Sequence, residues 1–316
     1  MAKVDFFRYG STICAMKIAI LCFRPLEEKL SYEEVRLKKA AMALGYDAKI
    51  FMAVECELSF DEKGPSVYYR GKPFPKVDVI IPRVSLLEDV SLYASILKQF
   101  QLMGIPVLNT YDAVTRAKNK LRTLQILSHY GIPTPRTFVV SQRDDLKGAI
   151  DRVGGFPVIM KSPFGSWGAG VMIAESFRNA LSSLDLIWSA KNSKQHMILI
   201  QEYVKESKGK DTRVFVVGGE VIASMERSAK KGEFRSNAAL GGAGREVSIT
   251  KEYEDMALKA TQLLDLEMAG VDIISTKNGP AVLEVNANPG FSELEAATGV
   301  DVAKSIIERA AALPVM

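Results

Sequence analysis

A predicted β-hairpin in the last third of the chain constrains the fold most strongly. Residues 271–276 and 280–285 are two short runs of β-branched and aliphatic residues, and residues 277–279 between them read Lys-Asn-Gly, a composition typical of hairpin turns. A three-residue turn centred on this segment places Asp272 opposite Glu284. The two side chains are then expected on the same face of the hairpin.

The same hairpin brings three oxygen ligands together. Side chains alternate between the faces of a strand, so Glu284 and Asn286 point the same way and can converge with Asp272. Hard oxygen ligands without Cys or His suit Mg²⁺ or Mn²⁺, which take their remaining ligands from water and substrate phosphates. The pattern indicates phosphoryl chemistry. For the hairpin taken alone, a solvated face with incidental carboxylates is the alternative.

A lysine and a glycine-rich loop follow another predicted strand. Residues 158–161 form an apolar strand that ends in Lys161, and Gly165, Gly168 and Gly170 follow. Glycines allow a backbone to approach a polyphosphate closely, and the lysine adds a fixed positive charge. The spacing matches neither the P-loop nor G-x-G-x-x-G, so neither of those sites is indicated. A plain tight turn is the alternative.

More polar residues follow in the same region. The predicted strand at 197–204 contains Gln201, Glu202 and Tyr203, an edge at which backbone groups can bind an adenine. A basic cluster, placed over the nucleotide, consists of Arg227, Lys230, Lys231 and Arg235. Asp211 and Arg213 begin the next predicted strand, and Ser236 and Asn237 follow the basic loop.

In this order of motifs the chain resembles the ATP-grasp superfamily and, more narrowly, the RimK family of glutamate ligases. Residues 234–237, 284–290 and 299–301 read almost as the family motifs do, and the resemblance covers about residues 16–309. It implies an ATP-grasp fold, α/β with an α+β lid, preceded by a Rossmann-like pre-ATP-grasp domain.

The resemblance also implies a set of site residues. Two Mg²⁺ or Mn²⁺ ions are held by Asp272, Glu284 and Asn286, and Lys161 and Arg235 act in catalysis. The implied ATP-binding residues are Lys120, Lys161, Gly165, Ser166, Gly168, Gly170, Glu202, Tyr203, Val204, Asp211, Arg235, Ser236 and Asn237.

The sequence departs from the family pattern at two places, and the second departure bears on the acceptor. Asn119 precedes Lys120 where the family often has Asp, and residues 164–170 are closer to relatives that modify amino-group carriers and cofactors than to the enzyme that modifies a ribosomal protein. The acceptor therefore stays open. Arg83, at a strand end, and Arg213 are the candidates for binding an acceptor carboxylate, and a salt bridge is an equally good account of Arg83.

The predicted organisation is an extension at 1–15, an α/β domain at 16–111, a linker helix and lid at 112–200, and a C-terminal domain at 201–316. The first domain is expected to hold parallel strands at 17–23, 47–52, 77–82 and 105–108. Two helices are expected between them, at about 32–44 and 88–103. One helix at 112–129 is expected to carry Lys120, with Arg116, Lys118 and Arg122 on a solvated face.

Composition excludes several classes of protein. With 41 basic and 37 acidic residues the chain has no nucleic-acid-binding arm, and two histidines make a histidine-based triad improbable. No apolar run reaches the roughly 18–20 residues of a membrane helix. Three cysteines without metal spacing favour a reducing, cytoplasmic location.

The expected activity is that of an ATP-dependent carboxylate–amine ligase that works through an acylphosphate. By resemblance the added amino acid is L-glutamate, the acceptor is a protein, peptide or cofactor with an acidic end, and the enzyme is a homo-oligomer, a dimer or tetramer. The alternatives are a ligase that makes dipeptides or extends a cofactor tail, and a nucleotide-binding regulatory or ribosome-associated protein. The intact set of Asp272, Glu284 and Asn286 argues against the last of these.

Overall fold

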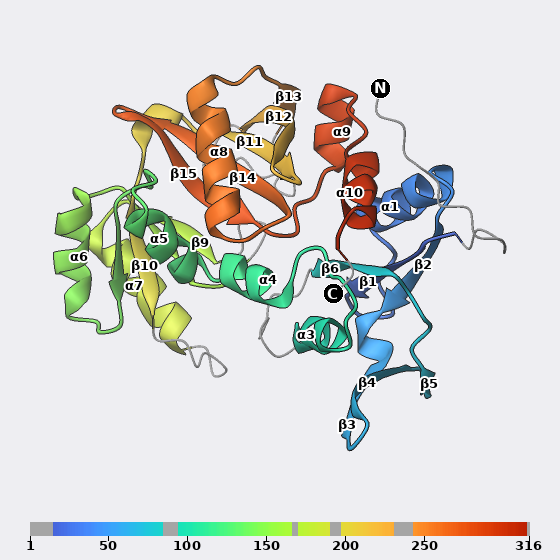
Figure 1. Cartoon of the computed structure of the whole chain (residues 1–316). Helices are drawn as coiled ribbons and strands as arrows, with labels where there is room; N and C mark the ends of the chain where they lie inside the picture. Colours follow the sequence, from blue (N-terminus) through green and yellow to red (C-terminus); the bar gives the residue numbers. More distant parts are fainter. Residues whose placement is uncertain (1–14, 85–93, 166–169, 190–196, 231–242, 315–316) are drawn as a thin grey trace.

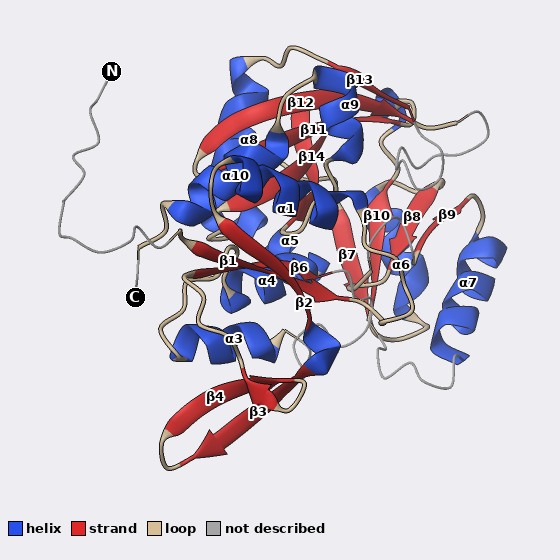
Figure 2. Cartoon of the chain, turned by 90° about the vertical axis from the view of Figure 1, so that its right-hand side faces the viewer, coloured by secondary structure: helices blue, strands red, loops and turns tan. Residues whose placement is uncertain are grey.

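The computed structural model describes residues 15–84, 94–165, 170–189, 197–230 and 243–314, and these build four sheets with helices around them (Figures 1 and 2). Within these ranges no helix is long and apolar enough to cross a membrane.

The first sheet is parallel, with β1 (Lys17–Phe23) between β2 (Asp47–Met52) and β6 (Val79–Val84). Helix α1 (Tyr32–Ala43) joins β1 to β2 and begins at a capping box formed by Ser31 and Glu34. The prediction of a strand at 105–108 was wrong, since Val107 forms only an isolated parallel bridge to Ile80.

A small antiparallel meander follows β2 and was not predicted. A short 3₁₀ turn, η1 (Ala53–Glu55), leads into β3 (Cys56–Asp61), β4 (Gly64–Tyr69) and β5 (Lys72–Pro73). The meander projects from the body of the molecule (Figure 2). Helix α3 (Ser95–Leu102) anchors it, because the Gln99 amide donates to backbone oxygens of both β3 and β4.

The single helix expected at 112–129 is two helices, α4 (Tyr111–Lys118) and α5 (Lys120–His129). Asn119 between them has an extended backbone, with φ −100° and ψ 103°, and its Oδ1 accepts from the backbone N–H groups of Leu121 and Arg122. Asn is among the strongest N-cap residues, so it starts a second helix where the apolar spacing alone predicts continuity.

The lid is a four-stranded antiparallel sheet in the order β7 (Thr137–Val140), β10 (Ile198–Glu202), β8 (Val158–Lys161) and β9 (Val171–Ala174). Helices α6 (Asp145–Val153) and α7 (Phe177–Ser189) supply apolar residues to its core. Strands and helices alternate along the lid, and the glycine-rich loop follows β8, the predicted strand at 158–161.

The largest sheet has the order β13 (Ala243–Glu246), β12 (Glu220–Ser228), β11 (Lys210–Val217), β14 (Met268–Thr276) and β15 (Gly279–Asn286). A 3₁₀ turn, η2 (Lys205–Ser207), connects it to the lid. Helix α8 (Lys251–Leu263) covers one face of this sheet. Helices α9 (Ser292–Thr298) and α10 (Val302–Ala311) lie on the other, where α10 also packs against α1 (Figure 1). The sheet is thereby joined to the first domain.

Candidate functional site

The predicted hairpin is present, but its turn differs from the prediction. Thr276 pairs with Gly279, so the turn has two residues instead of three, and a bulge lies between Ile273 and Asp272. The bulge adds the residue that the shorter turn lacks, and Asp272 pairs with Glu284 as predicted.

Asp272 is buried and surrounded by hydrogen-bond donors. Its Oδ2 lies 2.8 Å from Arg213 Nη2 and 2.9 Å from Arg227 Nη2, and Arg213 Nε donates to Oδ1. Asn286 Nδ2 lies 3.3 Å from the same Oδ2. Burial alone would raise the pKa of Asp272, but the two arginine charges hold that pKa below its usual value.

Glu284 lies beside lysines from two other elements. Lys120, at the start of α5, places Nζ 3.1 Å from Glu284 Oε1 and 2.8 Å from the carbonyl oxygen of Gly165 in the glycine-rich loop. Burial works to raise the pKa of Glu284, and the charges of Lys120 and Lys161 lower it below its ordinary value. Lys120 thus connects the hairpin to the lid.

Two of the lysines are poorly solvated. Lys161 ends β8 with only 8% of its surface exposed, and burial lowers its pKa to about 8. Burial also lowers the pKa of Lys118 to about 8, in the field of Glu284 and Lys120. The prediction that Lys118 and Arg116 lie on a solvated face was wrong, since Arg116 donates to the Leu264 carbonyl at the end of α8. Both residues are half-buried, and the helix α4 that carries them packs against β15.

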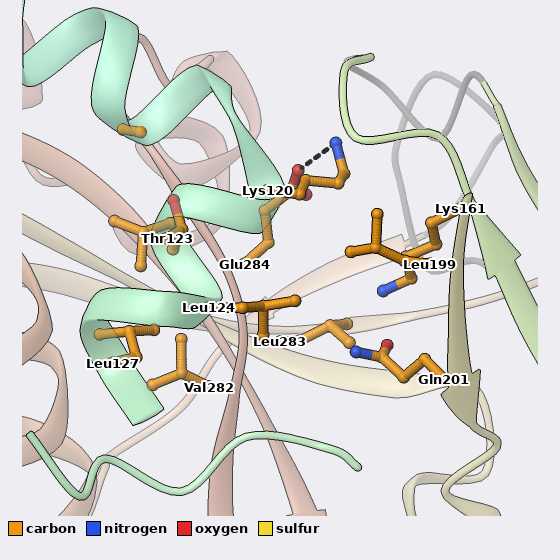
Figure 3. A pocket seen from close by; sticks show the side chains of 12 residues that line it. Lys120, Thr123, Leu124, Leu127, Lys161, Leu199, Gln201, Val282, Leu283 and Glu284 are labelled. Carbon is orange, nitrogen blue, oxygen red and sulfur yellow. Dashed lines mark ion pairs between the residues drawn. The ribbon is translucent and has the colours of Figure 1, made fainter. Parts of the chain in front are cut away.

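A narrow pocket lies between the lid, α5 and the hairpin. In Figure 3, Leu283 lies between Leu124 of α5 and Gln201 of the lid, while Lys161 and Glu284 flank the polar end. The pocket is lined by Ala117, Lys120, Thr123, Leu124, Leu127, Lys161, Leu199, Gln201, Val282, Leu283, Glu284 and Val285. It combines an apolar floor with cationic groups at one end.

The apolar lining of this pocket was not predicted. Leu124 lies in a predicted helix, and helical spacing cannot distinguish a core face from a ligand-binding face. Leu283 is the extra residue of the bulge, and no sequence pattern signals a bulge there. Leu199 lies on the lid strand β10, so only the packing of the lid on the hairpin brings it in, beside Gln201 of the edge that was predicted to bind an adenine.

Glu202, Tyr203 and Val204 line a second, more polar hollow at the end of β10, beside residues 276–278 at the hairpin tip. The Glu202 carboxylate accepts from the backbone N–H of Arg136 at 2.8 Å and lies 3.2 Å from Arg136 Nη2. The three residues therefore lie at the junction between the lid strand β10 and η2.

Asp211 and Arg227 lie deeper than predicted. Arg227 was placed in a basic cluster over the nucleotide, but it lies in β12 with 5% of its surface exposed. Its Nε and Nη2 donate to Asp211 Oδ1 and Oδ2 at 2.7 and 2.9 Å. Burial opposes the charged form of Arg227, but Asp272 and Asp211 raise its pKa above the ordinary value.

Arg83 lies at the C-terminal end of β6 with 5% of its surface exposed. Its Nη2 donates to the Pro289 carbonyl at 3.3 Å and its guanidinium lies 5.8 Å from the Phe291 ring centroid. Burial lowers the pKa of Arg83. Its buried Nη1 has no hydrogen-bond partner within the described ranges.

Several predicted residues lie outside the described residues: Ser166, Gly168, Lys231, Arg235, Ser236 and Asn237. The two described loop glycines, Gly165 and Gly170, have φ of 136° and 72°, a region that glycine adopts readily. The Ser162 N–H donates to the Gly170 carbonyl oxygen at 3.0 Å, which closes the loop at its base.

The oxygen atoms of Asp272, Glu284 and Asn286 fit a hard divalent cation. Within the described ranges no group of three or more His, Cys, Asp and Glu residues forms a metal cluster, and the amide oxygen of Asn286 is the third oxygen of the predicted set. Asp272 and Glu284 are paired across the hairpin and Asn286 contacts Asp272, so the three share one face. With Lys120 and Lys161 beside them, the site can hold a metal–polyphosphate complex.

Comparison with known proteins shows the family of the chain. A model described as the RimK-like ATP-grasp domain matches residues 117–310, and one described as the RimK PreATP-grasp domain matches residues 16–114. Among similar proteins, probable alpha-L-glutamate ligase 2 of Shewanella denitrificans is 40% identical over 294 residues, which is 93% of this chain and 94% of that protein. Probable alpha-L-glutamate ligase of Methanococcoides burtonii has the same identity and coverage.

Solved structures share the fold. The ATP-grasp ligase PsnB complexed with minimal precursor has a TM-score of 0.71 at 20% identity, over 93% of this chain and 98% of that one. The RimK domain protein ATP-grasp from Sphaerobacter thermophilus has a TM-score of 0.68 at 20% identity, over 93% and 99%. The predicted fold and the predicted ligase class are confirmed. The chain belongs to the RimK-like ATP-grasp family.

Proposed function

We propose that this protein is an ATP-dependent ligase that adds L-glutamate to an amino group or to a C-terminal glutamate of a protein, peptide or cofactor. The observation that carries the proposal is the meeting of Lys161, Lys120 and Glu284 at the polar end of the pocket between lid and hairpin. The names of the relatives at 40% identity support glutamate as the amino acid.

The reaction proceeds in two steps. The γ-phosphoryl group of ATP is transferred to a carboxylate oxygen, because a carboxylate is a poor electrophile at neutral pH, and ADP leaves. The amine then attacks the acyl carbon, inorganic phosphate leaves, and the amine loses a proton to give the amide. This route requires no covalent bond to the enzyme.

The side chains of this chain bind and orient the phosphates. Lys161 and Lys120 present cationic groups toward the polar end of the pocket, where charge develops during phosphoryl transfer. Asp272, Glu284 and Asn286 would hold two Mg²⁺ or Mn²⁺ ions, which supply charge neutralisation to the phosphate oxygens. One neighbour of the same fold is PsnB complexed with minimal precursor, Mg and ADP. Arg235 remains our proposal for a second catalytic cation.

The apolar part of the pocket accommodates the adenine. Leu283, Leu124 and Leu199 provide apolar surface, and residues 202–204 provide backbone groups at the junction between β10 and η2. Closing the lid on the hairpin would exclude water from the acylphosphate, with Gly165 and Gly170 at the ends of the loop nearest the phosphates. Ser236, Asn237 and Asp211 stay proposals for further contacts to ATP.

For the acceptor we propose a carboxylate bound at Arg83. The unpartnered, buried Nη1 of Arg83 supports this, because an unpaired guanidinium N–H is costly to bury without a ligand. Arg213 is the second candidate, although in the structure it is paired with Asp272. An acidic acceptor end, a homo-oligomer and a cytoplasmic location belong to the same proposal.

Mass spectrometry tests the assignment. The protein is incubated with ATP, magnesium and glutamate, with and without a peptide that ends in glutamate. Product masses that rise in steps of one glutamyl unit are expected. A product that contains a different amino acid, or equal use of neutral and acidic acceptors, contradicts the proposal and favours a ligase that makes dipeptides or extends a cofactor tail. ATP binding without ADP release contradicts an enzyme.

A further inference from the structure

The carboxylate of Asp272 carries protein donors where a metal ligand needs free oxygen lone pairs. Within the described residues its Oδ2 is approached by Arg213 Nη2 at 2.8 Å, Arg227 Nη2 at 2.9 Å and Asn286 Nδ2 at 3.3 Å. Its Oδ1 accepts from Arg213 Nε. Any cation that binds Asp272 must therefore displace donors that the chain supplies itself.

Arg227 holds a special place among these donors because it reaches two carboxylates on two strands. It lies on β12, bonds Asp211 on the neighbouring strand β11, and extends across β11 to Asp272 on β14. Arg213 on β11 forms its ion pair with Asp272. Contacts therefore link the four side chains into a chain of alternating charge on one face of the sheet, from Asp211 through Arg227 and Asp272 to Arg213.

The charge around this row disfavours a free divalent cation. Four carboxylates, those of Asp211, Asp272, Glu284 and Glu293, are accompanied by five cations, those of Arg213, Arg227, Lys118, Lys120 and Lys161. The described groups therefore carry one positive charge in excess when all are ionised. A metal that arrives with a polyphosphate brings its own negative charge, which relieves this repulsion.

The arrangement is not required simply to stabilise the fold. Burying ionic groups costs desolvation energy, and well-packed apolar residues commonly serve a sheet as well or better. Arg227, Asp211 and Asp272 are each less than 7% exposed, so their ionic interactions occupy a place that apolar side chains can fill. This points to a role in the site.

We infer that Arg227 is a positioning residue that occupies Asp272 until nucleotide arrives, and so makes metal binding depend on nucleotide. The inference rests on the proposed role of Asp272 as a metal ligand. Arg227 needs to give up only its contact with Asp272, because its Nε remains 2.7 Å from Asp211 Oδ1 and anchors the guanidinium. Metal and nucleotide then bind together and not in succession.

The test measures Mn²⁺ binding through the loss of the free-ion EPR signal, with and without ADP. Wild-type protein is expected to bind Mn²⁺ only with ADP present. Arg227→Met removes the charge at similar length and is expected to bind Mn²⁺ without ADP at least about tenfold more tightly than wild type, a change of ~1.4 kcal/mol. Adding Asp272→Asn to Arg227→Met is expected to abolish that binding.

Two further variants serve as controls. Arg245→Met also removes an arginine from this sheet, but Arg245 pairs with Glu226 at the surface, at 2.9 Å, so it should behave as wild type. Arg227→Lys restores the charge and should restore the dependence on nucleotide. If Arg227→Met leaves Asp211 too poorly compensated to fold, Asp211→Asn combined with Arg227→Met removes both charges, and its Mn²⁺ binding without ADP replaces the single variant.

The outcomes distinguish a failure of the proposed role of Arg227 from a failure of the proposed metal site. Wild-type binding of Mn²⁺ without ADP, as tight as that of Arg227→Met, overturns the role of Arg227 and leaves the metal site standing. Weaker binding by Arg227→Met than by wild type also overturns it, because Arg227 would then only support the fold. Absence of Mn²⁺ binding in wild type even with ADP overturns the metal site itself, and with it this inference.

Discussion

Lys120 Nζ lies 3.1 Å from Glu284 Oε1 and also donates to the Gly165 carbonyl at 2.8 Å, so one side chain connects the C-terminal hairpin with the glycine-rich loop of the lid. The Glu284 carboxylate and the Lys120 ammonium group lie together at the polar end of one pocket (Figure 3). Their ion pair is a contact between elements separated by more than 100 residues, which local sequence patterns do not reveal.

Replacing Glu284 by Gln is expected to lower turnover by roughly 10²-fold or more, because the amide cannot supply the negative charge that a metal at the phosphates requires. ADP release at saturating magnesium is the measurement. The fold is expected to remain, since Gln fits the same volume. Glu308→Gln, at an exposed position on α10, provides the matched control. Near wild-type turnover in Glu284→Gln removes this carboxylate from the mechanism.

ATP binding is expected to weaken as the pH rises above about 8, where the pKa of Lys161 lies because of burial. Below that pH the lysine is charged and attracts phosphate, and above it the free protein must first take up a proton. With one linked proton, the Kd for ATP rises by up to about tenfold per pH unit. Calorimetry in buffers of different ionisation enthalpy detects the uptake. No proton uptake at pH 9 contradicts the prediction.

The same pKa fixes the sign of the effect on stability. The unfolded chain holds the Lys161 proton up to its ordinary pKa, 10.5, whereas the folded protein releases it near 8. Between these values the unfolded state binds more protons, so the contribution of Lys161 to the free energy of unfolding increases with pH. Lys161→Met is expected to lose this increment, measured as a flatter pH dependence of the urea midpoint. An unchanged slope would count against a buried, charged Lys161.

Asn119→Ala is expected to lower the free energy of unfolding by about 1 kcal/mol, because it removes the oxygen that caps α5. Asn119→Asp, which restores the residue common in the family, keeps an equivalent cap and is expected to match wild type. Urea denaturation of the three proteins checks both. Equal losses in the two variants would show that the cap is not the source of the effect.

Asn109→Ala is expected to destabilise the protein by roughly 3 kcal/mol or more, because several buried backbone groups lose their partner. Asn109 donates to the Met268 and Ala287 carbonyls and accepts from the Glu267 and Met268 N–H groups, so it holds the start of β14 against the end of β15. The variant is also expected to bind Mg·ADP less tightly, since these strands carry the proposed ligands. Thermal melts with and without Mg·ADP measure both effects.

Asn109 follows Val107, whose parallel bridge to Ile80 places it beside the first sheet. Residues at the ends of parallel strands commonly face a ligand site. The structure shows instead that the Asn109 amide is fully engaged with backbone atoms of the C-terminal sheet. It supports the hairpin through contacts with residues 158 to 178 positions away in the chain.

Local patterns in the sequence determined most of the strands and helices and the pairing of Asp272 with Glu284, but not the meander of β3, β4 and β5. Strand alternation and turn composition depend on neighbouring residues, so the face shared by the oxygen ligands followed from the sequence alone. The two-residue turn and its bulge were missed, because each shifts the register by one residue and the two shifts cancel at Asp272.

Only the tertiary structure decided which charges meet. Arg227 read as part of a basic cluster and Lys118 as a solvated residue, yet packing buries one between Asp211 and Asp272 and turns the other toward Glu284. Sequence gives the charge of a side chain but not its solvation, which depends on the elements that close around it. The pKa of Lys161 and the counter-ions of Asp272 are set by that closure, because burial strengthens every interaction that water would otherwise screen.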